Sequence, residues 1–185
     1  MSDRTTGPAR SATAPADLGI GHWTLDAPAS SVGIRHKSVW GLVTVTGTFT
    51  EVSAEGETEA DGSAHGTLTV AAASIASGKA KLDTHLRSAD FFAADRYPSF
   101  SFAADRVVPG RADAAGTAEV TGRLTVLGVT RPLSFTVRTA AAGPDDVTLS
   151  GDVVVDRAEF GMTWNRGGML KGLTTVTLAL RFRRR

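Results

Sequence analysis

Apolar and polar residues alternate one by one along most of this chain, which is the period of a β-strand with one buried face. The clearest stretch is 43–50, where Val43, Val45 and Phe49 share one face and four threonines share the other. The same alternation recurs near residues 23–25, 32–36, 68–70, 100–108, 118–126, 133–138, 147–155 and 175–182. The pattern predicts eight or nine strands.

The connections between these strands are mostly short and rich in glycine, proline and aspartate. Strands buried on both faces would be apolar throughout, so the alternation indicates an antiparallel sheet with one wet face. Neighbouring strands joined in this way form an up-and-down meander, and closure into a barrel removes its two edges. A two-sheet sandwich has a similar pattern, but the meander favours an all-β, antiparallel barrel of about eight strands.

Only the segment 74–102 departs from the alternation. Its apolar residues recur at nearly helical spacing, at Leu82, Leu86, Ala89 and Ala93. The pair Phe91–Phe92 lies within the run, and Tyr97-Pro98 ends it. The pattern predicts a short helical insert that closes or lines part of the barrel.

With 185 residues, of which 42% are hydrophobic, the chain is long enough for one domain with its own core. Residues 1–19 are rich in Ser, Thr, Ala, Pro and Gly without a period, and are expected to form a flexible tail before a domain over 20–185. The absence of cysteine excludes disulfides and thiolate metal sites.

The net charge is +1 with both signs well mixed, so the composition argues against a nucleic-acid partner. No apolar run approaches the length of a transmembrane helix, and the first residues lack the apolar core of a secretory signal. A cytoplasmic protein is the expectation.

Five separate motifs carry a resemblance to a known family. They are WTLD near residue 23, VTGTF near 45, DTHLRSADFF with YPSFSF over 83–102, VTGRLTVLGVTRP near 120, and DRAEFGMTW near 156. Over residues 23–182 the chain resembles the YceI-like family of lipocalin-like polyisoprenoid-binding proteins. The resemblance implies an eight-stranded lipocalin-like barrel that holds a long isoprenoid chain in an apolar tunnel, and it makes a homodimer plausible.

The predicted function is therefore non-catalytic binding or carriage of a long apolar lipid, such as a polyprenyl chain or a quinone, with no cofactor. A barrel of about eight strands is either filled by side chains or holds one ligand, and the periodicity alone leaves both open. If it is hollow, the expected tunnel residues are Val45, Phe49, Leu86, Phe91, Phe92, Phe100, Phe102, Leu124, Phe135 and Val153.

Three polar side chains are candidates for the ligand's head group. His36, His85 and Arg87 lie near the insert in the sequence pattern, and an arginine fork suits phosphate oxygens. Alternatively, Arg87 pairs with Asp83 or Asp90 on the same short helix, and His36 is a satisfied residue of the barrel wall. Both interpretations remain open at this stage.

Other features have plainer explanations beside the functional ones. Trp40, Trp164 and Met169 are candidates for the mouth or for ordinary turn packing. Asp156-Arg157 matches the family motif and also fits a salt bridge at a strand end. The arginines that end the chain are expected to form a solvated basic tail rather than a membrane contact.

An enzyme is the alternative from a different class. The chain has no G-x-S-x-G elbow, no phosphate-binding glycine loop and no H-E-x-x-H, and its histidines lack metal-ligand spacing. The remaining catalytic hypothesis is a small hydrolase or isomerase that acts on a lipid-like substrate through His85 or His36.

Overall fold

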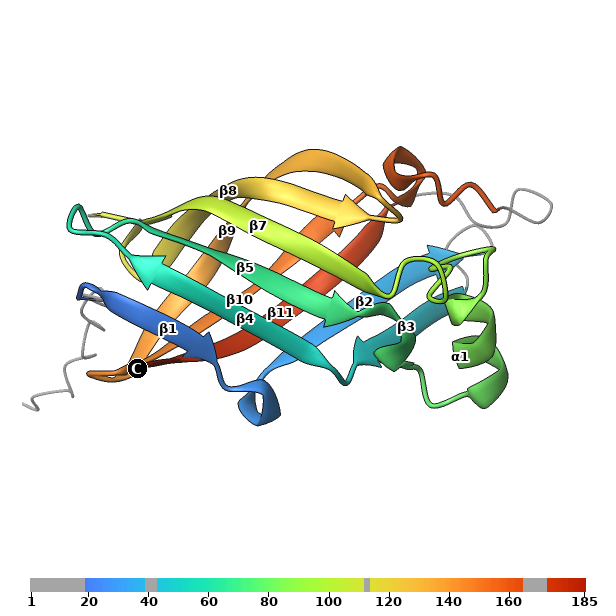
Figure 1. Ribbon diagram of the computed structural model, residues 1–185, viewed down its shortest axis with the longest axis horizontal. Coiled ribbons are helices and arrows are strands. Elements are labelled where there is room, and N and C mark those ends of the chain that lie inside the picture. The colour runs from blue at the N-terminus through green and yellow to red at the C-terminus, as the bar shows by residue number, and fades with distance from the viewer. Residues whose placement is uncertain (1–18, 39–42, 112–113, 165–172) are drawn as a thin grey trace, which may run out of the picture.

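The computed structural model describes residues 19–38, 43–111, 114–164 and 173–185 (Figure 1). Its strands are β1 (Gly21–Leu25), β2 (Ser31–Ser38), β3 (Val43–Phe49), β4 (Val52–Thr58), β5 (Ala64–Ala71), β6 (Ile75–Ala76), β7 (Ser99–Pro109), β8 (Thr117–Val126), β9 (Val129–Gly143), β10 (Asp146–Val155) and β11 (Thr174–Arg184). One α-helix, α1 (Ala80–Arg87), and three short 3₁₀ helices, η1 (Ala27–Ala29), η2 (Ala72–Ser74) and η4 (Arg157–Phe160), complete the described elements. The predicted tail falls outside the described residues, apart from Gly19.

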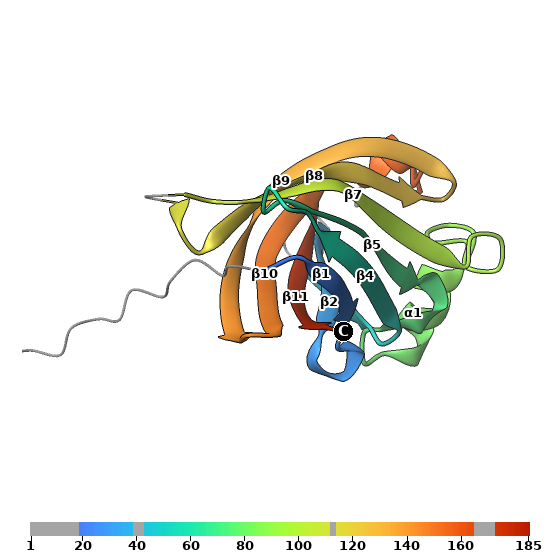
Figure 2. The ribbon, with the colours of Figure 1, turned by 60° about the vertical axis from the view of Figure 1, so that its left-hand side comes forward.

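The strands form one antiparallel sheet that closes on itself. Neighbours follow the order β1-β4-β5-β7-β8-β9-β10-β11, and a further pairing joins β11 back to β1. This ring has eight members, and β2, β3 and β6 continue three of them beyond a bend. The predicted all-β, antiparallel eight-stranded barrel with one short helix is confirmed, and Figure 2 shows the strands wrapping around the axis.

The longest bent member consists of β1 and β2, which both pair with β11 at different heights. Between them, η1 and Ser30 turn the corner. The Ser30 hydroxyl donates to the Asp26 carbonyl oxygen (2.8 Å) and accepts from the main-chain N–H of Arg181 (2.9 Å). A serine at this point therefore bonds both the turn and the neighbouring strand, and keeps β11 attached across the break.

The seam between β1 and β11 corrects the expectation of a basic tail. The terminal arginines belong to β11, where Arg183 pairs with Asp26 (2.8 Å) and Arg184 pairs with Asp145 (2.8 Å). The Arg184 guanidinium also lies 5.4 Å from the centre of the Trp23 ring. These cations contact carboxylates and an aromatic face of the same molecule, on the strand whose pairing with β1 closes the barrel.

Strands β8 and β9 are joined by a tight turn at Leu127 and Gly128, whose φ angles of +52° and +73° match a type I′ hairpin. One local prediction needs correction. The helical spacing ends early, because α1 stops at Arg87 and Ala93 adopts a left-handed φ of +42°. The insert after α1 is a series of turns, and it carries the phenylalanine pair to the barrel wall.

The alternating apolar residues point into the barrel and form its core. Ile75 and Ala72, beside the insert, are completely buried. Among the described helices, none has the length and apolar character that a membrane crossing requires.

An apolar cavity with a polar end

The interior of the barrel beside α1 holds a cavity of about 210 Å³. Strands β2, β3, β5, β7, β8, β9, β10 and β11 and the insert all contribute to its wall. All ten side chains that the sequence predicts along a tunnel line it: Val45, Phe49, Leu86, Phe91, Phe92, Phe100, Phe102, Leu124, Phe135 and Val153. Other apolar lining residues include Val32, Ile34, Leu68, Val70, Leu82, Val126, Leu133, Val155, Phe160, Met162, Val176 and Leu178. At this end the barrel is therefore hollow rather than filled.

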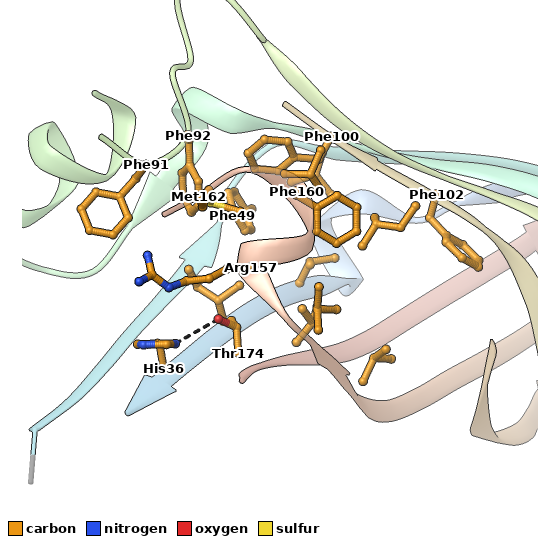
Figure 3. A pocket seen from close by; sticks show the side chains of 18 of the residues that line it. His36, Phe49, Phe91, Phe92, Phe100, Phe102, Arg157, Phe160, Met162 and Thr174 are labelled. Carbon is orange, nitrogen blue, oxygen red and sulfur yellow. Dashed lines mark hydrogen bonds between the residues drawn. The ribbon is translucent and has the colours of Figure 1, made fainter. Parts of the chain in front are cut away.

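Three phenylalanines from separate elements form one wall of the cavity (Figure 3). The ring of Phe92, from the insert, lies 5.9 Å from that of Phe49 on β3 and 5.2 Å from that of Phe100 on β7. Leu82 and Leu86 on α1 line the same cavity one helical turn apart. The insert thus contributes its apolar face to the cavity.

A polar group lies at one end of this apolar wall, where His36, Thr174 and Arg157 meet (Figure 3). His36 near the end of β2 faces Thr174 at the start of β11 in the strand register, and the His36 Nδ1 atom is 3.0 Å from the Thr174 hydroxyl. His36 is only 9% exposed, and its Nε2 atom is buried without a hydrogen-bond partner in the described part of the chain. An unsatisfied buried nitrogen facing a cavity is a group that a ligand atom can satisfy.

Arg157 enters the cavity from η4, which begins directly after β10. Asp156 caps this 3₁₀ helix by accepting a hydrogen bond from the Ala158 N–H (2.9 Å). The Arg157 Nη2 atom donates to the Trp164 carbonyl oxygen (2.9 Å), and the whole residue is 9% exposed. Burial lowers the pKa of Arg157 from its ordinary value of 12.5, and the Asp156 carboxylate opposes this shift. Arg157 still carries its charge at neutral pH.

The positive charge of Arg157 affects its neighbour. Burial, and secondly the charge of Arg157, lower the pKa of His36 below its ordinary value of 6.5. The imidazole is therefore neutral at pH 7, and its Nε2 atom donates or accepts according to the tautomer. The polar end thus combines one cation, one neutral imidazole and one hydroxyl.

The other two predicted head-group residues do not line the cavity. His85 packs at its outer rim with its ring 5.0 Å from both Phe91 and Trp164, and its Nε2 atom is 3.3 Å from an Asp90 oxygen. Arg87 donates to the Ile75 carbonyl oxygen (2.9 Å). Both side chains hold the insert against the barrel, and Asp90 faces His85 rather than Arg87.

Sequence reasoning left Arg157 and Thr174 out of the site. The fragment DRAEFG carried the signal for Arg157, but its aspartate and arginine were equally compatible with a salt bridge. In the structure Asp156 caps η4 and directs the arginine into the barrel. Of the three residues considered for the mouth, Trp164 lies at the rim, while Trp40 and Met169 lie outside the described residues.

Comparison with known proteins decides the family. The family model described as YceI-like domain matches residues 23–183, nearly the whole barrel. The chain belongs to the YceI-like family. A UPF0312 protein of Pseudomonas putida is 38% identical to this YceI-like chain over 73 residues, which are 40% of this chain and 36% of that relative. The matched part of the chain thus spans little more than a third of that curated relative.

Solved structures resemble this YceI-like domain over most of its length. BcnA of Burkholderia cenocepacia superposes with a TM-score of 0.75 at 22% identity, covering 85% of this chain and 98% of its own. A polyisoprenoid-binding domain from Saccharophagus degradans superposes with a TM-score of 0.69 at 15% identity, covering 88% and 98%. At these identities the likeness establishes a common fold.

Proposed function

We propose that this YceI-like domain binds a long apolar lipid of the isoprenoid type, with the hydrocarbon tail inside the barrel and the head at His36, Arg157 and Thr174. The observation that carries the proposal is an apolar cavity of about 210 Å³ with these three polar side chains together at one end. Membership of the family and the likeness to a polyisoprenoid-binding domain support the same class of ligand.

The cavity wall is chemically suited to a hydrocarbon. Burial of one methylene group is worth about 0.8 kcal/mol, so each isoprene unit contributes several kcal/mol before the costs of ordering are subtracted. A hydrocarbon tail makes no hydrogen bonds, and the described residues along this wall present almost no polar groups that would need a partner. Tail binding therefore depends on length and shape, and we expect lipids of similar length to compete.

The polar end favours a head group with an uncharged oxygen, such as a quinone carbonyl or a prenyl hydroxyl. Arg157 is the only lysine or arginine among the described residues of the lining, and one of its nitrogens already binds Trp164. A diphosphate would bring several negative charges to a lining whose described residues supply one cation, and burial of uncompensated charge is costly. A carbonyl oxygen, in contrast, needs only the Nε2 proton of His36 or one guanidinium N–H.

We also infer a non-catalytic role. The alternative, a small hydrolase or isomerase, would need an acid–base pair beside the bound substrate. The His85–Asp90 pair lies at the exposed rim and outside the lining, and the Nδ1 atom of His36 is engaged by the hydroxyl of Thr174. These contacts support a structural role for His85 and a head-group role for His36.

Extraction of the purified protein with organic solvent, followed by mass spectrometry, tests the function. We expect a long apolar adduct, and apo protein reloaded with a prenyl alcohol or a quinone analogue should bind it more tightly than the matching prenyl diphosphate. Val153→Phe fills the cavity and should abolish binding, whereas Val154→Phe, on the outer face of the same strand and 52% exposed, should not. Equal binding by both variants would refute the cavity as the site.

A further inference from the structure

A second cavity, of about 150 Å³, occupies the other end of the barrel. Its wall includes Trp23 on β1, Ala104 on β7, Ala118 on β8, Val147 on β10 and Phe182 on β11. These elements converge at the end of the barrel opposite α1, near the chain's carboxyl terminus (Figure 1). The proposed function uses the first cavity, which leaves this second apolar space without a role.

The inward residues of β11 show that the two cavities follow one another along the barrel axis. Thr174, Val176 and Leu178 line the first cavity, and Leu178, Leu180 and Phe182 line the second. Strands β5, β7 and β9 show the same order, and on each of them one residue lines both cavities. Four side chains therefore belong to both walls: Leu68, Phe102, Phe135 and Leu178.

Two of the shared side chains are aromatic and touch each other. The rings of Phe102 and Phe135 have their centres 5.4 Å apart and are tilted by 51°. Gly122 gives the Phe102 ring its room, because a Cβ atom at this glycine would lie 2.7 Å from the Phe102 Cζ atom. The backbone at Gly122 thus allows the ring to lie between the two spaces.

The size of each cavity limits what it holds. A dry cavity of about 150 Å³ lined by aliphatic and aromatic side chains accommodates a benzene molecule. By this measure the first cavity, at about 210 Å³, takes only about eight carbons, between one and two isoprene units. A longer tail that stays inside the barrel must enter the second cavity, and its path leads past Phe102 and Phe135.

We propose that Phe102 and Phe135 form an internal partition that sets the length of the lipid tail this domain accepts. The inference rests on the proposed function and adds a specificity-determining pair to it. Short tails end at the partition. Longer tails must displace the rings to reach the second cavity, so each added isoprene unit strengthens binding less than its apolar surface alone would predict.

The test is a titration of the full chain with geraniol, farnesol and geranylgeraniol, whose tails grow by one isoprene unit at each step. Phe102→Ala joins the two cavities, and it should raise the ratio of geranylgeraniol to geraniol affinity about tenfold or more over the unmodified protein. The matched control is Phe100→Ala, which removes the same ring two residues away from a position that lines the first cavity only. It widens the first cavity but leaves the partition in place, so its ratio should rise less than that of Phe102→Ala.

A second substitution checks the path of the tail. Ala118→Leu projects into the second cavity, so in the Phe102→Ala background it should cancel the gain for geranylgeraniol and leave geraniol binding unchanged. Phe135→Leu opens the partition with a smaller loss of core volume and should shift the ratio in the same direction. Unfolding curves establish that each variant is folded.

The outcomes separate the two proposals. If no prenyl alcohol binds to the unmodified protein or to any variant, the proposed function is wrong. If the alcohols bind but Phe102→Ala and Phe100→Ala give the same ratio, the partition is wrong and the lipid-binding function stands. A gain that survives Ala118→Leu would also overturn the partition, because the tail would then extend elsewhere.

Discussion

Replacement of His36 by glutamine should remove a specific part of the pH dependence of stability. Burial and the charge of Arg157 lower the pKa of His36 in the folded state, whereas the unfolded chain has the ordinary value of 6.5. Below pH 6.5 the unfolded chain therefore takes up a proton that the folded protein does not. The stability that the neutral imidazole contributes is fully present above pH 6.5 and is lost as the pH falls toward the lower folded value.

The size of the effect follows from linkage. One proton bound only by the unfolded chain changes the free energy of unfolding by about 1.4 kcal/mol per pH unit, and this slope applies only between the two pKa values. It is an upper limit, because it assumes a difference of one full proton between the unfolded and the folded protein. The carboxyl groups with lowered pKa values, Asp61, Asp83 and Asp146, titrate below their ordinary 3.8 and leave this window clear.

The assay is denaturant unfolding of both proteins in steps from about pH 8 to about pH 5, the range in which histidine charge changes. Glutamine keeps a polar group near Thr174 but does not titrate, so the difference between the two curves isolates His36. We expect the curves to run parallel above pH 6.5 and the protein with His36 to lose stability faster below it. Parallel curves over the whole range would refute the burial and charge argument.

Three further predictions concern a core phenylalanine, the close contact between β7 and β8 at Gly122, and the loss of stability in acid. Phe92→Ala should lower the free energy of unfolding by about 3–5 kcal/mol, because Phe92 is only 8% exposed. Phe91→Ala should lower it by less, because Phe91 is half-buried, and denaturant unfolding of the two variants compares these losses. Gly122→Ala should lower the melting temperature, since its Cβ atom would lie 2.2 Å from a main-chain oxygen of β7, and an unchanged melting temperature would contradict this contact. Hydrogen bonds from Ser63 lower the pKa of Asp61 to about 2, so the stability that this carboxylate contributes above pH 3.8 is lost between pH 3.8 and about 2. In an acid titration followed by circular dichroism, Asp61→Asn should therefore reduce the pH dependence of stability in that range.

Most of the barrel was predictable from the sequence because most of its strands alternate and their inward residues face one interior. Strand β4 was not predicted, because its sequence VSAEGET has few apolar residues. The bends were not predicted either, because β1 and β2 differ little in pattern, and the break between them depends on a hydrogen bond between the Ser30 side chain and the distant strand β11. Likewise, the threonine-rich stretch revealed the face of Val45 but gave no indication of which strand would lie beside it.

In the candidate site, the apolar lining could be predicted from the sequence and the polar end could not. Apolar lining residues such as Phe100 and Val153 could be predicted because alternate residues of a strand face the same side. All ten of the predicted apolar residues, on the strands and on the insert, line the cavity. The polar end depends on three distant segments that the closed sheet brings together, and no local pattern pairs His36 with Thr174 or Arg157. His85 and Arg87 looked equally suitable in the sequence, because both flank Leu86 and the apolar face of α1 does not distinguish them. The homodimer and the cytoplasmic location stay predictions.

The seam between β1 and β11 has a consequence for how the molecule is made. It joins β1 to β11, so the ring cannot shut until the ribosome has released both strands and everything between them. Until then the growing meander exposes the interior side chains and an unpaired strand edge, and pairings so distant in sequence form slowly. The nascent protein therefore passes through an open, aggregation-prone state. In that state a chaperone or an early-bound lipid would cover the exposed interior side chains.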